Sequence, residues 1–320
     1  VKNLIKLIKS SETISLHTEF DGEDIHTREI VSVTIALKDK TCYFIPINHH
    51  PDHLGEGNKN LSKDHLLKVL RASWEDSTKS VYTEHAKRDC DFALCNNIDF
   101  NATKLDIVQM HYLLEPSGNH SLHYLLSNHL GQSLSSLTKG EIIEAIPFAV
   151  AAEMSGERAY GLFCLGEIFS QKLNENDLTK TYRDIDEKMF TILGSMEREG
   201  VALNIGFLED LESQFNIKVE KIVEKIGKYS SVPINLRSSK QVGGLLFDEL
   251  NLPVQKKTKT GFSTDSEVLE ILAGMGLSDV PELLLSFREL DKLLSTYIKA
   301  LPKMVSEKSG RVHTNLSQHN

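Results

Sequence analysis

The sequence predicts an α/β domain with a partly antiparallel sheet, followed by a mainly α-helical region. Three early segments, Thr13–Phe20, Ile30–Leu37 and Thr41–Ile47, are rich in β-forming residues and partly alternate apolar with polar positions. Helical patterns mixed with one short strand follow them, and strands succeeded by helices are typical of a mixed α/β layer architecture. Two long stretches nearer the carboxyl end repeat apolar residues every three or four positions, which indicates amphipathic helices.

The remaining elements of the first half follow from the same patterns. We expect one short strand near Val81 and helices at these positions: Lys63–Ser73, from Lys87, through Leu114, His120–Leu130 and Phe148–Leu173. The polar run Asn174–Asp177 then interrupts the apolar pattern. We therefore predict two domains, residues 1–174 and residues 175–320, with Tyr182–Arg198 as the first helix of the second domain.

The second domain contains the two amphipathic stretches. The first stretch repeats apolar residues at three- and four-residue spacing from Leu208 to Ile226. The second stretch does the same from Leu283 to Leu301. Each forms a single apolar stripe on a helix, and two such stripes can bury each other in an antiparallel pair. The intervening segment would then form the tip that joins the two helices.

Composition limits the class of protein. The 320 residues carry a formal net charge of −9, which argues against a uniformly basic nucleic-acid coat but allows a local basic face. The four cysteines show no CxxC or Cys/His ligand spacing, so we expect no zinc site and a reducing compartment. No apolar run reaches membrane-spanning length. We expect a cytoplasmic monomer with no membrane partner.

The tip segment holds two similar helix starts. Ser238–Gln241 and Thr264–Glu267 each place a hydroxyl three residues before Gln or Glu, as a capping box does. The basic, hydroxyl-rich loop Lys256–Gly261 lies between them. Helix N-termini present unpaired N–H groups that can bind phosphate. These residues are either ordinary capped helices with solvated lysines or a clamp on a nucleic-acid backbone.

Four blocks in order, NLRSSKQ, LNLPVQKKTKTGFST, STYI and RVHT, resemble the thumb of family A DNA polymerases, the bacterial DNA polymerase I type. The resemblance implies sequence-tolerant, salt-dependent contacts to a primer–template duplex. The DNA-binding residues that it implies are Asn235, Ser238, Lys240, Gln241, Lys256, Lys257, Thr258, Ser263, Thr264, Ser266, Ser295, Thr296, Tyr297, His313 and Gln318.

Two positions in these blocks need separate comment. Arg237 stands where some members of the family have a small polar residue, so the resemblance leaves its contact open. Tyr297 also falls on the apolar stripe of the second long helix, so we expect its ring in the core.

The first domain resembles the DnaQ-type 3′–5′ exonuclease of these polymerases, which has a ribonuclease H-like fold. That family carries Asp-x-Glu on its first strand, because two magnesium ions need hard oxygen ligands. The matching residues here are His17 and Glu19, which period two places on one face of the strand. Imidazole is a poor magnesium ligand, so only Glu19 is retained from this first motif.

The other two motifs are also incomplete. Asp89 matches a second metal carboxylate and is retained, whereas Asp106 is expected to be a helix cap. The third motif, Tyr-x-x-x-Asp, is lost at Val150 and Met154. Neighbouring Glu153 and Glu157 would project at other helical angles. With remnants only at Glu19 and Asp89, we expect no intact catalytic site, no bound metal and a vestigial fold.

The resemblance as a whole implies part of a template-directed DNA polymerase. The family's palm aspartates, which use Mg²⁺, and its fingers helix would follow Asn320, so we expect these residues alone neither to polymerise nor to proofread. Two alternatives stay open. One is an active, metal-dependent exonuclease with a DNA-binding arm, using His17 with manganese or zinc. The other is a non-enzymatic DNA-binding or helical scaffold module.

Overall fold

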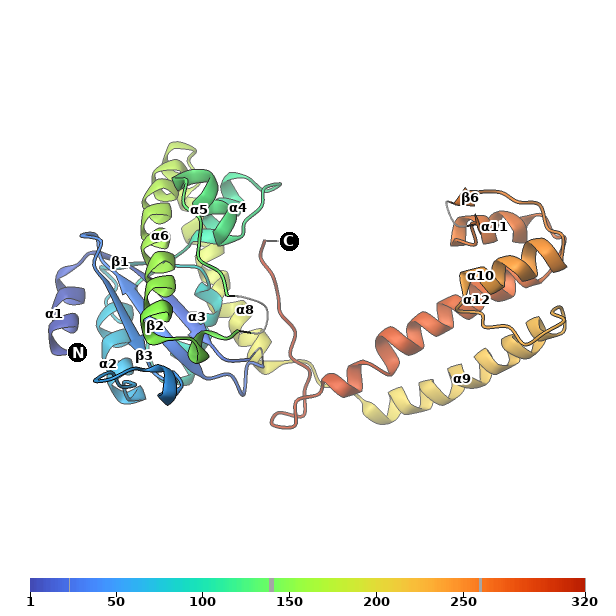
Figure 1. Ribbon diagram of the computed structural model, residues 1–320, viewed down its shortest axis with the longest axis horizontal. Coiled ribbons are helices and arrows are strands. Elements are labelled where there is room, and N and C mark those ends of the chain that lie inside the picture. Colours follow the sequence, from blue (N-terminus) through green and yellow to red (C-terminus); the bar gives the residue numbers. More distant parts are fainter. Residues whose placement is uncertain (23, 138–140, 259–260, 320) are drawn as a thin grey trace. The chain divides into compact units, whose positions relative to one another are not determined.

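A computed structural model describes residues 1–22, 24–137, 141–258 and 261–319 (Figure 1). The chain divides into two compact units, Val1–Gly200 with His313–Asn320, and Val201–Val312. Each unit has hydrophobic clusters of its own. Within the described ranges, no helix is both long and apolar enough to cross a membrane.

The first unit is built on a five-stranded sheet in the order β3-β2-β1-β4-β5. Its strands are β1 (Thr13–Phe20), β2 (Ile30–Ala36), β3 (Cys42–Pro46), β4 (Ser80–Thr83) and β5 (Thr103–Asp106). β1 pairs antiparallel with β2 and β2 with β3, whereas β1, β4 and β5 run parallel. The expected α/β domain with a partly antiparallel sheet is confirmed.

Helices cover both faces of this sheet, and β1 shows which residues meet which layer. Ile14 and Leu16 pack in one cluster with α1 (Lys2–Ser10) and α2 (Lys63–Trp74). The hydroxyl of Ser15 points the other way and donates to the carbonyl of Ala159 at 2.5 Å. Ala159 belongs to the long helix α6 (Phe148–Glu175), which crosses the sheet (Figure 1). Successive residues of β1 therefore face opposite helical layers.

A glycine allows α6 to lie close to the sheet. A Cβ atom on Gly166 would lie 2.2 Å from the ring of Tyr82 on β4, so any side chain there would overlap the ring. Gly166 is itself buried. The close helix–sheet packing at this point thus depends on the absence of a side chain.

The expected domain boundary does not coincide with the units of the structure. After α6 the chain continues through α7 (Thr179–Thr181), the π-helical turn η3 (Tyr182–Asp186) and α8 (Glu187–Glu199). Tyr182 and Phe190 are buried in the same cluster as Cys90 of α3 (Ala86–Cys95), so this segment packs on the first unit. The polar run at 174–177 is a helix–helix connection, and the units divide at Gly200.

Four further short elements complete the first unit. They are η1 (Pro51–His53), α4 (Ile107–Leu114), α5 (Leu122–Leu130) and η2 (Ile143–Ala145).

The second unit is mainly helical, as expected. Its elements are α9 (Ile205–Gly227), α10 (Ser239–Gly243), η4 (Gly244–Glu249), β6 (Lys257–Thr258), β7 (Gly261–Phe262), α11 (Ser266–Gly274), α12 (Val280–Lys292), η5 (Leu293–Ile298) and η6 (Leu301–Met304). α9 and α12 lie side by side and antiparallel, with α10 and α11 at one end of the pair (Figure 1). Their buried residues share one cluster, which includes Ile226, Val242, Leu272 and Leu284.

The expectation that Tyr297 is a core residue is wrong. Its side chain is 48% exposed, whereas Leu294 and Ile298 are buried. The reason is local, because Leu293–Ile298 is a π-helical segment. A π-turn contains more residues per turn than an α-turn, so the apolar stripe counted at α-helical spacing shifts to neighbouring positions.

Candidate functional site

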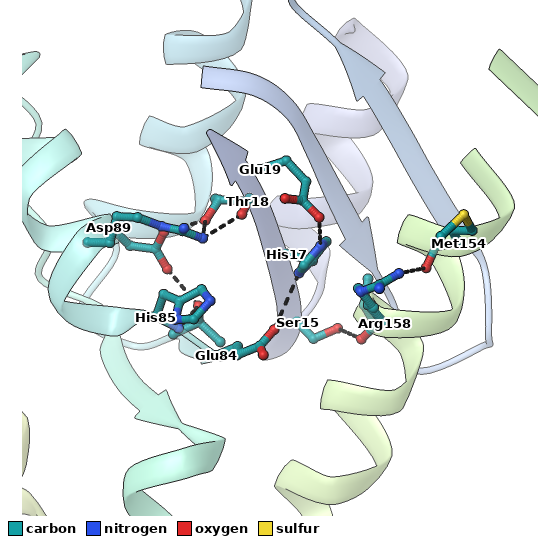
Figure 2. A network of polar contacts seen from close by, with 12 residues as sticks. Ser15, His17, Thr18, Glu19, Glu84, His85, Asp89, Met154 and Arg158 are labelled. Atoms are coloured by element: carbon teal, nitrogen blue, oxygen red, sulfur yellow. Dashed lines mark hydrogen bonds and ion pairs between the residues drawn. The ribbon is translucent and has the colours of Figure 1, made fainter. Parts of the chain in front are cut away.

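On the α6-facing side of β1, one histidine lies between two carboxylates (Figure 2). His17 Nε2 lies 2.8 Å from Glu19 Oε1, and His17 Nδ1 lies 3.7 Å from Glu84 Oε2. His17 and Glu19 share a face of the strand as the period of two predicts. Glu84 follows β4 and was not assigned from the sequence, although it is two residues beyond Tyr82, which faces the same layer.

Basic side chains compensate the charge of this histidine–carboxylate cluster, His17, Glu19 and Glu84. Burial alone would raise the pKa of Glu19, but His17, Arg158 and Arg88 outweigh it and hold that pKa below its usual range. Burial raises the pKa of Glu84, and the same three side chains oppose the rise. The charges that stabilise these carboxylates are thus side chains of the protein.

The second retained carboxylate lies on the opposite face of β1. Asp89 is completely buried, and its two oxygens accept hydrogen bonds from the hydroxyls of Thr18 at 2.8 Å and Thr83 at 2.6 Å (Figure 2). Thr18 lies between His17 and Glu19 in β1 and so faces the other layer. Burial raises the pKa of Asp89, and Arg88 with the two hydroxyls opposes the rise. The structure therefore does not bring Asp89 and Glu19 together.

The third motif contributes no carboxylate. Val150 is exposed, and the side chain of Met154 packs in a cluster with Val31 and Ile146. Arg158, one turn further along α6, donates from Nη1 to the carbonyl of Met154 at 3.2 Å. Neither of the neighbouring glutamates replaces the missing ligand.

Those two glutamates are placed elsewhere. Glu153 is exposed on α6, and Glu157 accepts a hydrogen bond from the backbone N–H of Ser135 at 3.2 Å. Asp106 is the N-cap of α4, since its carboxylate accepts from the N–H groups of Val108 and Gln109. The expected capping role is confirmed. Burial raises the pKa of Asp106 to about 7.

This face does not fit the two metal ions that the exonuclease family implies. Two-metal hydrolysis needs several free carboxylate oxygens around one point. Here Glu19 is bound to His17, and the Asp89 oxygens are bound to two hydroxyls on the far side of the strand. Within the part of the chain that the structure describes, no group of three or more His, Cys, Asp or Glu side chains is arranged to hold a metal ion.

The second unit contains a groove of about 1120 Å³. Cationic, hydroxyl and acidic side chains line it from α10, the β6–β7 hairpin and the last turns of α12 with η5. Six of the residues implied as DNA contacts lie in its lining: Lys240, Thr258, Ser263, Thr264, Ser295 and Thr296. Lys240, Ser295 and Thr296 are exposed to solvent, so a ligand can reach them.

Other implied contacts lie outside the groove lining but in the same unit. Asn235, Gln241, Lys256, Lys257, Ser266 and Tyr297 are exposed. Lys259, which belongs to the predicted lysine loop, lies outside the described residues. His313 and Gln318 belong to the first unit instead.

Contacts within the first unit hold those last two residues. His313 Nδ1 lies 2.7 Å from the carbonyl oxygen of Glu197, and Gln318 donates from Nε2 to the carbonyl of Asp186 at 3.4 Å. His313 and Gln318 therefore belong to a different compact unit from the other residues that the resemblance implies.

One of the two predicted helix caps is confirmed and the other is wrong. Ser238 caps α10 by accepting from the N–H of Gln241, although the Gln241 side chain binds the N–H of Asn235 and does not close the box. The cap of α11 is Asp265, which accepts from the N–H of Val268 at 2.9 Å. Thr264 is buried, and its carbonyl accepts a hydrogen bond from Arg288 at 2.5 Å.

The geometry thus defines a mixed α/β sheet unit and a mainly helical unit that contains a groove. Residues 1–153 match the family model described as 3′-5′ exonuclease, and residues 206–320 match that of DNA polymerase family A. These matches confirm the resemblance that the motifs of the two segments indicated.

The relatives it resembles are named DNA polymerase I. That of Geobacillus stearothermophilus is 30% identical over 313 residues, covering 96% of this chain and 34% of the relative. That of Bacillus subtilis is 28% identical over 302 residues, covering 93% and 32%. The chain therefore spans about a third of the length of these relatives.

A solved structure has the same fold. It is the POL domain of Pol1 from M. smegmatis in complex with DNA primer-template and dNTP, with a TM-score of 0.79 and 22% identity. The match covers 99% of this chain and 51% of that one.

Proposed function

We propose that this chain is part of a template-directed DNA polymerase whose second unit binds the sugar–phosphate backbone of a primer–template duplex. The observation that carries the proposal is the groove, where Lys240, Arg288 and Lys292 lie among hydroxyl side chains. Cations and hydroxyls are the usual partners of phosphate oxygens. The similar polymerase structure was solved with primer-template DNA, which supports the same ligand class here.

The test is a binding measurement on the full chain. Neutralising Lys256, Lys257 and Lys259 together to Gln should weaken binding to a fluorescent primer–template hairpin, read by anisotropy across a salt series. Each lost phosphate contact should reduce the slope of log K against log salt by about 0.9, so a change of roughly 2 to 3 is expected.

A matched control neutralises three exposed lysines on α9, Lys218, Lys221 and Lys225. This control has the same change in net charge but lies away from the groove lining. Equal losses in the two triple variants would mean that net charge, and not the lysine loop, controls binding, and the proposal would be wrong.

We further propose that the exonuclease-like domain does not cleave DNA. The pairing of Glu19 with His17 and the burial of Asp89 support this. A 3′-labelled single strand incubated with the chain and Mg²⁺, then with Mn²⁺, should keep its length. Shortening that disappears in Glu19→Ala would establish an active nuclease and refute this part of the proposal.

The polymerase proposal concerns the longer protein of which this chain spans a part. The catalytic palm aspartates that the family uses are expected beyond Asn320, with Mg²⁺ as their metal. We expect the chain by itself to bind duplex DNA without extending the primer. Template-directed incorporation by the isolated chain would contradict that expectation.

A further inference from the structure

An ion pair connects two walls of the groove. Arg237, just before α10, meets Asp291 near the end of α12, and both residues line the groove. The Nε of Arg237 lies 3.1 and 3.0 Å from the two carboxylate oxygens, and Nη2 also donates to Oδ1. The side chain of Arg237 is 70% exposed, and that of Asp291 is 20% exposed. The pair is therefore bidentate and open to solvent.

A second cation close to the groove is paired in the same way. Lys256 Nζ lies 3.0 Å from Asp265 Oδ2 and 3.7 Å from Glu267 Oε2. Asp265 lines the groove, and Lys256 belongs to the loop that we expect to bind phosphate. Asp265 accepts hydrogen bonds from the backbone of Val268 and from the side chains of Lys256 and Ser263. These hydrogen bonds lower the pKa of Asp265 to about 2, so its carboxylate stays ionised.

These two ion pairs place the carboxylates of Asp291 and Asp265 at the groove, where the phosphates of a bound duplex would add further negative charge. A phosphate that binds Arg237 must displace Asp291 or approach its carboxylate closely, and like charges repel. An exposed ion pair is weak enough to exchange partners. The carboxylates would thus act as internal competitors of the DNA backbone.

We propose that Asp291 limits duplex affinity by competing with a backbone phosphate for Arg237, which makes Arg237 a latent phosphate-binding residue of this groove. This inference rests on the proposed duplex binding by the second unit. It concerns a position whose contact the family resemblance leaves open. Asp265 has the corresponding role for Lys256, but it also caps α11, so Asp291 is the cleaner position to test.

The experiment measures anisotropy of a fluorescent primer–template hairpin with the full chain at several salt concentrations. Asp291→Asn keeps the shape of the side chain and removes its charge. It should bind the hairpin about two- to fivefold more tightly at low salt. The slope of log K against log salt should steepen by about 0.9, because one more cation is free to meet a phosphate.

The control Glu224→Gln removes the same charge from an exposed site on α9, where Glu224 pairs only with Lys228 among the described ion pairs. If Glu224→Gln tightens binding as much as Asp291→Asn does, the effect is one of net charge and the proposal is overturned. Weaker binding by Asp291→Asn would also overturn it, because Asp291 would then orient Arg237 for the phosphate.

A double-mutant cycle identifies the partner. In the Arg237→Gln background, Asp291→Asn should gain no more affinity than Glu224→Gln does. An undiminished gain would show that the freed residue is not Arg237 and would refute the assignment.

Failure of the inference can be told apart from failure of the proposed function. If the unmutated chain binds the hairpin and loses binding on neutralisation of the lysine loop, but Asp291→Asn has no effect, only the competition is refuted. If the unmutated chain shows no salt-dependent binding, the proposed function itself is wrong.

Discussion

Both units of this protein contain carboxylates whose oxygens are bound by other side chains, but the two settings differ in burial. In the first unit Asp89 is completely enclosed, and its oxygens bind the hydroxyls of Thr18 and Thr83. In the second unit Asp291 binds an arginine that is 70% exposed. The first arrangement is part of the fold, whereas the second is open to an incoming ligand.

The difference shows that burial determines what a retained charge can do. A completely buried carboxylate whose two oxygens each accept a hydrogen bond has fewer free lone pairs, and no solvent-exposed oxygen, to offer a metal ion. An exposed pair exchanges partners at little cost, because water already stabilises both members. The described carboxylates of the exonuclease-like face are therefore engaged within the fold, whereas the Arg237–Asp291 pair of the groove remains accessible.

The largest effect expected from this comparison is that of Asp89→Ala. The variant leaves two buried hydroxyls without their acceptor, so the free energy of unfolding of the first unit should fall by roughly 2 to 4 kcal/mol. Urea unfolding followed by circular dichroism measures the change. Asp89→Asn, which still offers one acceptor and one donor, should cost clearly less. Equal losses would show that the charge, and not the hydrogen bonds, stabilises this position.

Acid should destabilise the first unit selectively. Burial, with His120, holds the pKa of His111 at about 4. Above pH 6.5, neither the folded nor the unfolded state protonates this residue. Between pH 6.5 and 4 only the unfolded state does, so stability falls by up to about 3 kcal/mol and then levels off.

The second unit provides an internal reference for that titration, because residues 201–312 include no histidine. Calorimetry from pH 7 to 4 should show the melting transition of the first unit moving down by more than that of the second. His111→Gln should reduce the pH dependence by about one proton over this interval. Equal shifts of both transitions would contradict the assignment.

Packing should be disturbed to a smaller extent by Gly166→Ala. The added methyl group would overlap the ring of Tyr82 beneath α6, and overpacking costs about 1 to 3 kcal/mol. Thermal unfolding measures the loss. The comparison is Gly274→Ala on α11, where a Cβ meets nothing within 4 Å, so that variant should lose no stability.

The smallest effect on stability should come from Asp291→Asn. Because the Arg237–Asp291 pair is largely exposed, its removal should change the free energy of unfolding by less than about 1 kcal/mol. If Asp291→Asn lowered the free energy of unfolding as much as Asp89→Ala does, the proposed difference between the buried Asp89 contacts and the exposed Arg237–Asp291 pair would be wrong.

Much of the fold followed from local pattern. Strands β1 to β4, helices α2 to α6, the antiparallel pair of α9 with α12, and the caps Asp106 and Ser238 are as predicted. Helix α1 and strand β5 were not predicted. Each depends on periodicity or on a hydrogen bond to a backbone group a few residues away. Local signals of this kind are present in the sequence itself.

The errors share a different origin. The cap of α11 is Asp265, and Thr264 instead binds Arg288, which lies far along the chain. Tyr297 is exposed because a π-turn shifts the stripe of its helix. The boundary lies at Gly200 because Phe190 packs with Cys90. In each case a distant contact or a local change of helical pitch overrode the pattern.

The sequence by itself determined which family these segments resemble, the order of their elements and the loss of carboxylates at His17 and Met154. Only the tertiary structure decided that Asp89 faces away from Glu19, that Glu84 joins His17, and that Asp291 binds Arg237. The physical reason is that residue identity and periodicity are properties of the chain. The partner that each charge meets depends on how distant segments pack, and that is decided when the whole unit folds.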